Sequence, residues 1–145
     1  MATSRPCAKI GSRATVLIAD TSAWIDYLKA KGSPQAGRLR QAITQHELVV
    51  VDPILLEVMA GAREDAVART QRLLEAQHLE ALSPKLDWLD AATIYRQLKW
   101  RGITIRSQID ALIAAAAIRL DLPVLHRDRD FAHIAQHTAL QIVEP

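Results

Sequence analysis

The sequence is poor in cysteine and glycine, and these shortages narrow the kinds of protein it can be. Cys7 is the only cysteine, so an internal disulfide and a cysteine-rich zinc site are both excluded. A chain with a single thiol fits a reducing compartment, and we expect a cytoplasmic location. The five glycines form neither a phosphate-binding loop nor a dinucleotide-binding fingerprint.

Long apolar runs are also missing. None approaches the ~20 residues that a helix needs to cross a bilayer, so we expect no membrane span. Residues 1–15 hold three basic residues and no acid, but they lack the apolar core of a secretory signal. Their composition resembles that of a transit peptide, although a disordered extension or an upstream start codon explains it better. We expect one folded domain over residues 16–145.

The bulk composition is that of an ordinary globular protein. Half of the residues are hydrophobic and 23% are charged. The net charge of +2, from 18 basic and 16 acidic residues, does not by itself indicate a nucleic-acid partner.

Short apolar segments alternate with helical patterns along the chain. This predicts an α/β fold in three layers, with a mostly parallel central sheet flanked by helices. The predicted strands cover 16–19, 48–51, 124–126 and 140–143, with 79–82 either an edge strand or a connector. The predicted helices cover 23–31, a segment opened by Ser33-Pro34, 53–61, 64–77, 84–102, 107–120 and 130–136.

Four acidic residues stand where the chain passes from one of these elements to the next: Asp20, Glu57, Asp110 and Asp128. Asp20 and Asp128 closely follow predicted strands, and in open α/β sheets the site lies beyond the carboxyl ends of the strands. Four carboxylates that folding can bring together indicate a site for a hard cation such as Mg²⁺ or Mn²⁺. The spacing of the five histidines does not match a metal-binding motif.

Each acid also has a structural interpretation. Asp20 could cap the next helix, but Ser22 looks better placed for that role, which leaves Asp20 for function. Glu57 could face solvent, yet its apolar neighbours favour a carboxylate that has a partner. For Asp110 the two interpretations balance, because Ser107 and Asp110 have the spacing of a capping box.

Asp128 and Asp130 share a turn in which one of them is expected to cap the following helix. We assign Asp128 to the site because it is nearer the strand end, and keep Asp130 as the alternate. Thr21 and Ser22 follow Asp20 directly, so a hydroxyl there could assist by binding water on the ion or a phosphate.

Two further segments are candidates for binding. The segment RQLKWRGITIR (96–106) has four cations and no acid, so Lys99, Arg101 and Arg106 could contact phosphates while Trp100 stacks on a base. A solvated helix face with a buried tryptophan is an equally good interpretation. Helix 23–31 is expected to expose Trp24, Ile25 and Leu28, either as a groove for a partner helix or as ordinary core.

Taken together, VLIADTSAWIDYL, the glutamate of LLEVMAGAR, SQIDALIAAAAIRL and VLHRDRDF resemble a PIN domain. More narrowly, they resemble the VapC-type ribonuclease toxins of bacterial toxin–antitoxin pairs. Each motif alone is common, but four in this order are specific. The resemblance covers the chain from about Val16 to its end, and the N-terminal extension departs from it.

The resemblance implies that Asp20, Glu57, Asp110 and Asp128 bind the metal. It also implies an endoribonuclease that depends on Mg²⁺ or Mn²⁺ and cuts cytoplasmic RNA, often tRNA or rRNA. Lys99, Arg101 and Arg106 then become candidate RNA contacts. The resemblance further implies a homodimer, and a small antitoxin whose tail covers the site.

The chemistry of phosphodiester hydrolysis agrees, since a hard cation activates water and neutralises charge on the phosphoryl oxygens. We expect Asp20 and Asp110 to bind the ion most directly, and their clustering to raise some carboxylate pKa values. A haloacid-dehalogenase-type phosphatase is a poor rival, because its D-x-D motif is absent. A catalytically inactive PIN-like module that only binds RNA is the remaining alternative.

Overall fold

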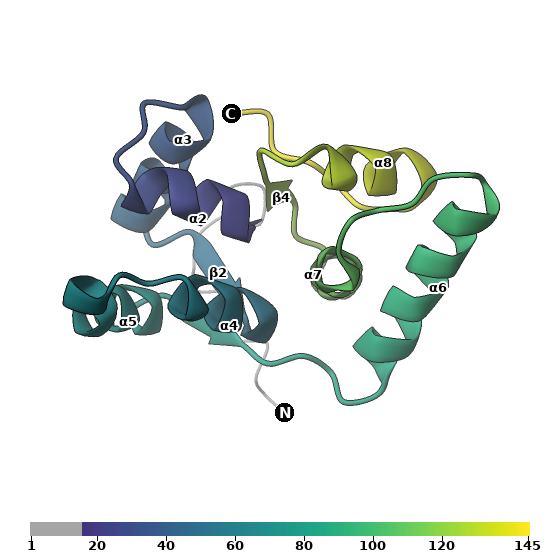
Figure 1. Ribbon diagram of the computed structural model, residues 1–145, viewed down its shortest axis with the longest axis horizontal. Coiled ribbons are helices and arrows are strands. Elements are labelled where there is room, and N and C mark those ends of the chain that lie inside the picture. The colour runs from purple at the N-terminus through teal and green to yellow at the C-terminus, as the bar shows by residue number, and fades with distance from the viewer. Residues whose placement is uncertain (1–15) are drawn as a thin grey trace.

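A four-stranded parallel sheet lies at the centre of the computed structural model, which describes residues 16–145 (Figure 1). The order is β3-β2-β1-β4, made by β1 (Leu17–Ala19), β2 (Leu48–Val51), β3 (His78–Glu80) and β4 (Val124–Leu125). All three pairings are parallel, which confirms the predicted fold class. The extension expected over residues 1–15 lies outside the described residues.

Three of the four strands are buried on both faces. Every residue of β1, β2 and β4 is buried, which explains their continuous apolar sequences. The uncertain segment at 79–82 overlaps the edge strand β3 (His78–Glu80). The strand predicted at 140–143 is wrong, because this segment makes only an isolated bridge between Ile142 and Val124. Its partner β4 has only two residues, so a longer ladder of strand hydrogen bonds cannot form.

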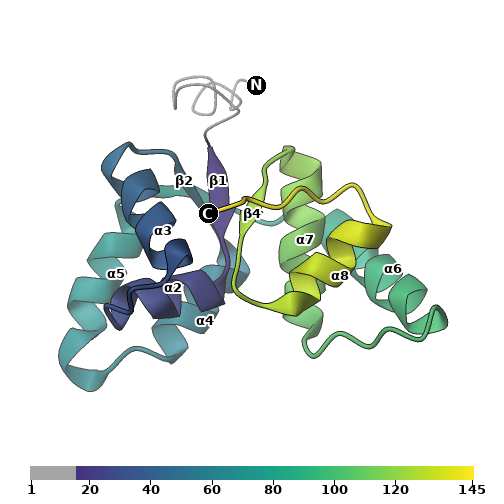
Figure 2. The same ribbon diagram turned by 90° about the horizontal axis from the view of Figure 1, so that it is seen from above.

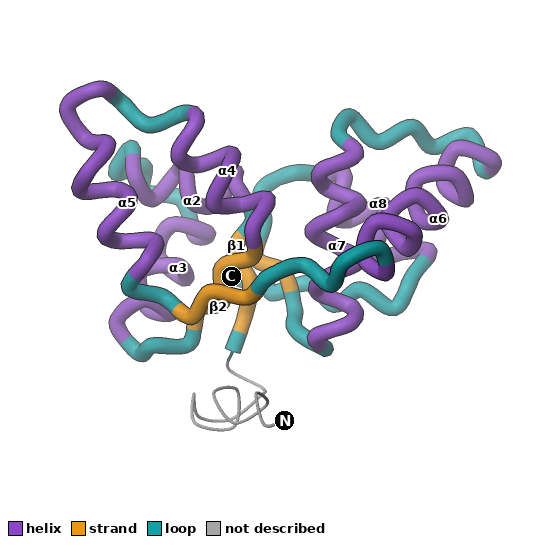
Figure 3. The backbone as a smooth tube through the Cα atoms, turned by 90° about the horizontal axis from the view of Figure 1, so that it is seen from below, coloured by secondary structure: helices purple, strands orange, loops and turns teal. Residues whose placement is uncertain are grey.

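Eight helical segments flank the sheet within the described part of the chain. In chain order they are α2 (Thr21–Leu28), α3 (Pro34–Thr44), α4 (Asp52–Ala60), the 3-10 turn η1 (Glu64–Ala66), α5 (Val67–Glu75), α6 (Leu86–Trp100), α7 (Gln108–Leu120) and α8 (Arg129–His137). Figure 2 shows α2 to α5 on one side of the strands and α6 to α8 on the other. Figure 3 shows the strands between these two groups, which gives the predicted three layers.

Helix α7 is the most deeply buried of these segments. The predicted apolar stripe is confirmed, but burial extends around the helix, since every residue from 111 to 117 is buried. The cause is its alanine-rich sequence, which lets α4, α6 and α8 all pack against it. An ion pair from buried Asp87 on α6 to Arg119 on α7, with N–O distances of 2.9 Å, fastens the two helices.

Two helix starts differ from the sequence prediction. Ser33 does cap α3, accepting a hydrogen bond from Ala36 N–H at 3.1 Å. Helix α4 begins at Asp52, one residue before the predicted start, and the Asp52 carboxylate accepts from Leu82 N–H at 3.1 Å, which holds a distant segment. Helix α6 begins at Leu86, not directly after Ser83-Pro84, because Lys85 takes a left-handed conformation with φ of 70°.

The exposed face expected on residues 23–31 is correct only in part. Ile25 and Leu28 are exposed, at 37% and 40%, whereas Trp24 is fully buried. Trp24 is covered because α2 packs along α3 and α4, and its ring meets Tyr27 edge-on with centroids 6.1 Å apart.

Candidate active site

Three aspartates form a tight oxygen cluster. One carboxylate oxygen from each of Asp110, Asp128 and Asp130 lies within 4.8 Å of the other two. Asp110 comes from the first turn of α7, while Asp128 caps α8 and Asp130 lies in its first turn. Asp128 and its alternate Asp130 therefore both belong to the cluster.

Asp20 lies at the same edge of the sheet, directly after β1. Its backbone N–H donates to Leu125 O at 2.9 Å, which places it beside the end of β4. Its carboxylate accepts from Ala23 N–H at 3.1 Å and from the Ser22 hydroxyl at 2.7 Å. Asp20 is therefore the cap of α2, and the assignment of that role to Ser22 is wrong. Ser22 is already inside the first turn, so its hydroxyl reaches back to Asp20.

The electrostatics show that the acids share one environment. Burial raises the pKa of Asp110 to about 7, and the charges of four further acids add to the effect: Asp128, Asp20, Asp130 and Glu57. Burial also raises the pKa of Asp20 to about 6, against its hydrogen bonds to Ser22 and Ala23. A cation among these groups would lower both pKa values, because it favours the charged carboxylates.

Glu57 lies on α4 and contacts the first residue of α2. It is half-buried, and the Thr21 hydroxyl donates to its Oε1 at 2.5 Å. Glu57 is not part of the three-aspartate cluster, but its charge still acts on Asp110. Thr21 and Ser22 thus each hold one acid, Glu57 and Asp20 respectively.

Arg106 is the counterion of the cluster. Its guanidinium lies 2.6 Å from Asp128 Oδ1 and 3.6 Å from Asp130, and its backbone N–H donates to Asp130 at 2.8 Å. Burial alone would raise the pKa of Asp128, but hydrogen bonds from Asp130 N–H and Arg106 outweigh it and lower that pKa. The Arg106 side chain is 68% exposed and has room to move.

The other two candidate RNA contacts lie away from the acids. Lys99 and Arg101 are exposed at the end of α6. Arg101 Nη1 lies 2.8 Å from His137 Nδ1, at the far end of α8 from Asp128.

One pair near the site was missed by the sequence analysis. Arg127 donates its backbone N–H to Ser22 Oγ at 2.9 Å, and its Nε to Asp26 Oδ2 at 2.7 Å. Asp26 is 1% exposed. The loop that carries Asp128 is thereby fastened to α2. No local pattern marks this pair, because Asp26 and Arg127 lie 101 residues apart in the chain.

The donor set fits a hard divalent cation. All candidate ligands are carboxylate oxygens, which Mg²⁺ and Mn²⁺ prefer, and no histidine or cysteine among the described residues joins the cluster. Burial, followed by the charges of neighbouring acids, raises the pKa values of Asp20 and Asp110, and a cation bound among these carboxylates would favour their charged forms.

Comparison with known proteins places this chain in a family. The PIN domain family model matches residues 17–136. This chain belongs to the PIN domain family. Two curated members, VapC ribonuclease Mb1587 of Mycobacterium bovis and ribonuclease VapC11 of Mycobacterium tuberculosis, are each 37% identical to it over 129 residues. The alignment covers 87% of this PIN domain chain and 96% of either relative, so it belongs with the VapC ribonucleases.

Solved structures agree on the fold. A chain in the crystal structure of DNA-bound VapBC from Salmonella typhimurium superposes with a TM-score of 0.69 at 16% identity. The match covers 88% of this PIN domain chain and 96% of the other.

Proposed function

We propose that this chain is a Mg²⁺- or Mn²⁺-dependent endoribonuclease, acting as the toxin of a VapBC-type toxin–antitoxin pair. The observation that carries the proposal is the convergence of acids from β1, α4, α7 and α8 on one edge of the sheet. The ribonuclease relatives at 37% identity support the reaction and the RNA substrate. We take residues 16–145 as the nuclease domain.

The acids have distinct roles in this proposal. Asp20 and Asp110 would hold the ion most directly, together with Asp128 and Asp130, which lie close to Asp110. Glu57, held by Thr21, would orient water at the ion. When bound, the ion lowers the pKa of water and neutralises charge on the phosphoryl oxygens. Ser22 acts indirectly, because its hydroxyl is engaged by Asp20 and Arg127.

The RNA approaches from the side of Arg106. A cation that replaced Arg106 as the partner of Asp128 would free the guanidinium for a phosphate oxygen, to which it can donate two hydrogen bonds. Lys99 and Arg101 extend the positive surface beyond it. A tRNA or an rRNA in the cytoplasm is the expected target.

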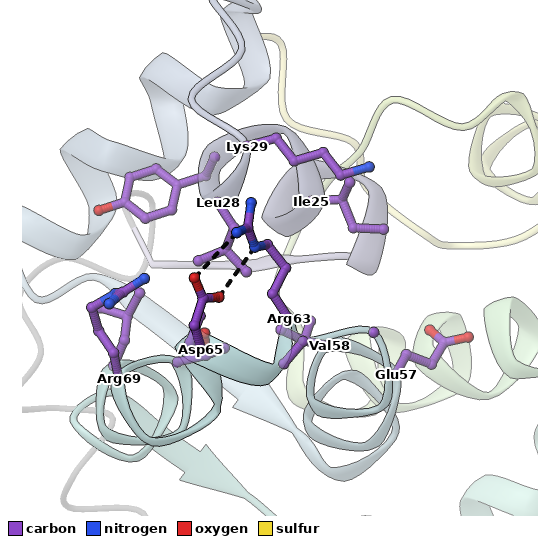
Figure 4. Close-up of a pocket in the computed structure, with 14 residues that line it drawn as sticks. Ile25, Leu28, Lys29, Glu57, Val58, Arg63, Asp65 and Arg69 are labelled. Carbon is purple, nitrogen blue, oxygen red and sulfur yellow. Dashed lines mark hydrogen bonds and ion pairs between the residues drawn. The ribbon is translucent and has the colours of Figure 1, made fainter.

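A pocket beside the site suits the proposed antitoxin. Helices α2, α4 and α5 enclose about 790 Å³, with Ile25, Leu28 and Val58 among its apolar residues. In Figure 4 the Arg63–Asp65 pair crosses this pocket, and Glu57 lies at one end of it. An amphipathic segment of a small partner would bury its apolar face here and extend its tail toward the acids. The VapBC complexes among the structural neighbours support such a partner. A homodimer is part of the same proposal.

Cleavage with and without metal tests the proposed function. Purified protein should cut mixed cellular RNA in Mg²⁺ or Mn²⁺ and stop when a chelator is added. Asp20→Asn and Asp110→Asn should lose cutting by at least about 100-fold while the fold survives, as expected when charge stabilisation at the phosphate is lost. Asp90→Asn, which removes an exposed acid from α6, is the matched control and should cut normally. If the protein binds RNA but does not cut it under any of these conditions, it is instead the catalytically inactive PIN-like module that only binds RNA.

A further inference from the structure

Trp100, the last residue of α6, is the most exposed of the large hydrophobic residues in the described part of the chain. Its side chain is 74% accessible, so the interpretation of a buried tryptophan fails. An indole presents a large apolar area and a flat face, and leaving both in water is unfavourable unless a partner covers them.

The surroundings of Trp100 are cationic. The Arg96 guanidinium lies 5.5 Å from the centre of the indole ring, and Lys99 and Arg101 adjoin Trp100 in the chain. No acidic residue occurs between positions 91 and 109. A flat aromatic face among cations is the arrangement by which proteins bind single-stranded nucleic acid, with bases stacked and phosphates paired.

Trp100 also lies within reach of the acids. Its neighbour Arg101 contacts His137, the last residue of α8, while Asp128 caps the first turn of that helix. Nine helical residues span about 13 Å, so the two sites are separated by roughly one short helix. The loop after Trp100 returns to Arg106 beside Asp128, and Figure 2 shows α6 and α8 on the same side of the sheet. One RNA strand can therefore occupy both places.

We propose that Trp100 is a stacking platform for an unpaired RNA base a few nucleotides from the phosphate that is cut, with Arg96, Lys99 and Arg101 contacting the adjoining phosphates. This inference rests on the proposed function for its RNA substrate, and it narrows that substrate to RNA with unpaired bases. Bases inside a duplex are stacked on each other and cannot offer a face to the indole. The platform therefore selects a single-stranded segment, such as a loop.

The surface around Trp100 is less suited to a second copy of the chain than to RNA. In a two-fold contact the same patch meets itself, so the cations around one Trp100 would meet those around the other. The apolar residues Leu86, Trp88 and Leu89 lie at the opposite end of α6, where these cations are absent.

Binding measurements test the platform without requiring catalysis. The probe is a short single-stranded RNA of mixed sequence with a fluorescent label at one end, and anisotropy is followed in the presence of a chelator. Trp100→Ala should weaken binding by about 5-fold to about 100-fold, the range for removing one stacking aromatic. Trp100→Phe should recover most of the loss, and the same RNA annealed to its complement should respond much less. Trp88→Ala removes another exposed tryptophan of α6, at 58%, and should bind like the wild type.

Equal affinities of Trp100→Ala and Trp88→Ala would overturn the platform. A loss of mass in light scattering, specific to Trp100→Ala, would overturn it too, because the indole would then cover a second copy. Cutting by the wild type in Mg²⁺ is measured separately. Its absence would defeat the proposed function while leaving the binding comparison valid, whereas normal cutting with equal affinities would defeat the platform alone.

Discussion

The charged form of Asp110 destabilises the folded protein when no metal ion is bound. Burial, followed by the charges of the neighbouring acids, raises its pKa from 3.8 to about 7. Folding therefore binds a proton that the unfolded chain releases between these pH values. Stability is lost as the pH rises through this window, and the loss is complete above a pH of about 7. The same carboxylate is expected to attract a divalent cation, so this cost in stability accompanies its proposed function.

Replacing Asp110 with Asn removes this charge at nearly constant size. With a chelator present, Asp110→Asn should raise the free energy of unfolding by on the order of 1–3 kcal/mol at about pH 8, and by less at about pH 5. Added Mg²⁺ should stabilise the wild type and leave the variant almost unchanged. Thermal unfolding at the two pH values, with and without Mg²⁺, measures both effects. A variant that is less stable than the wild type at every pH would contradict the proposed origin of the pKa.

At the scale of elements, local sequence patterns predicted most of the helices and strands and missed what joins them. The apolar runs of β1 and β2 and the periodicity of α7 are local signals, and they were interpreted correctly. The cap of α2 was misassigned because Asp20 and Ser22 are equally good caps by residue type, and only the fold decides between them. Burial of Trp24 depends on α3 and α4, which no pattern within α2 can report.

The Asp26–Arg127 pair is such a connection, between α2 and the loop that carries Asp128. Arg127→Ala leaves the buried Asp26 without its cation, and should cost about 1–3 kcal/mol of unfolding free energy. Because Asp128 is then less well held, the affinity for Mg²⁺ should also fall, whereas Arg127→Lys should restore part of both. Denaturant unfolding and calorimetric titration with Mg²⁺ measure the two quantities.

Arg63→Ala is the matched control, since the Arg63–Asp65 pair is exposed on both sides. Its loss should change stability by less than about 1 kcal/mol and leave Mg²⁺ affinity unaltered. If both variants lost stability equally, the burial of Asp26 would have no special importance. If Arg127→Ala lost stability but kept its Mg²⁺ affinity, the pair would be structural only.

At the scale of the whole molecule, the parallel sheet explains why acids from distant positions meet. Strands β1 and β4 are neighbours and point the same way, so Asp20 and Asp128 leave the sheet at one edge. This convergence could be predicted from the order of acids and strands. The place of Arg106 between Asp128 and Asp130 could not, because it depends on the path of the loop between α6 and α7.

The two sides of the sheet have separate tasks in the proposed function, and this separation can be tested. The pocket of α2, α4 and α5 would hold the antitoxin, while α6 to α8 would bind RNA. Leu28→Lys places a charge in the apolar part of this pocket, where an unpaired charge is costly to bury. Co-purification of the small protein encoded by the neighbouring reading frame should fall by at least about 10-fold, since a loss of about 1.4 kcal/mol already gives this factor. Cutting of RNA by the variant alone should continue.

Leu86→Lys is the matched control, because Leu86 is similarly exposed, at 48%, but lies on α6. It should retain the partner, which stays on the α2 side of the sheet. Loss of the partner in both variants would mean that the antitoxin covers both sides. Retention in both would move the antitoxin away from this pocket. Leu28→Lys alone could also lose both RNA cutting and the partner. The pocket would then contribute to the RNA-binding surface, which would contradict the proposed separation of the two sides.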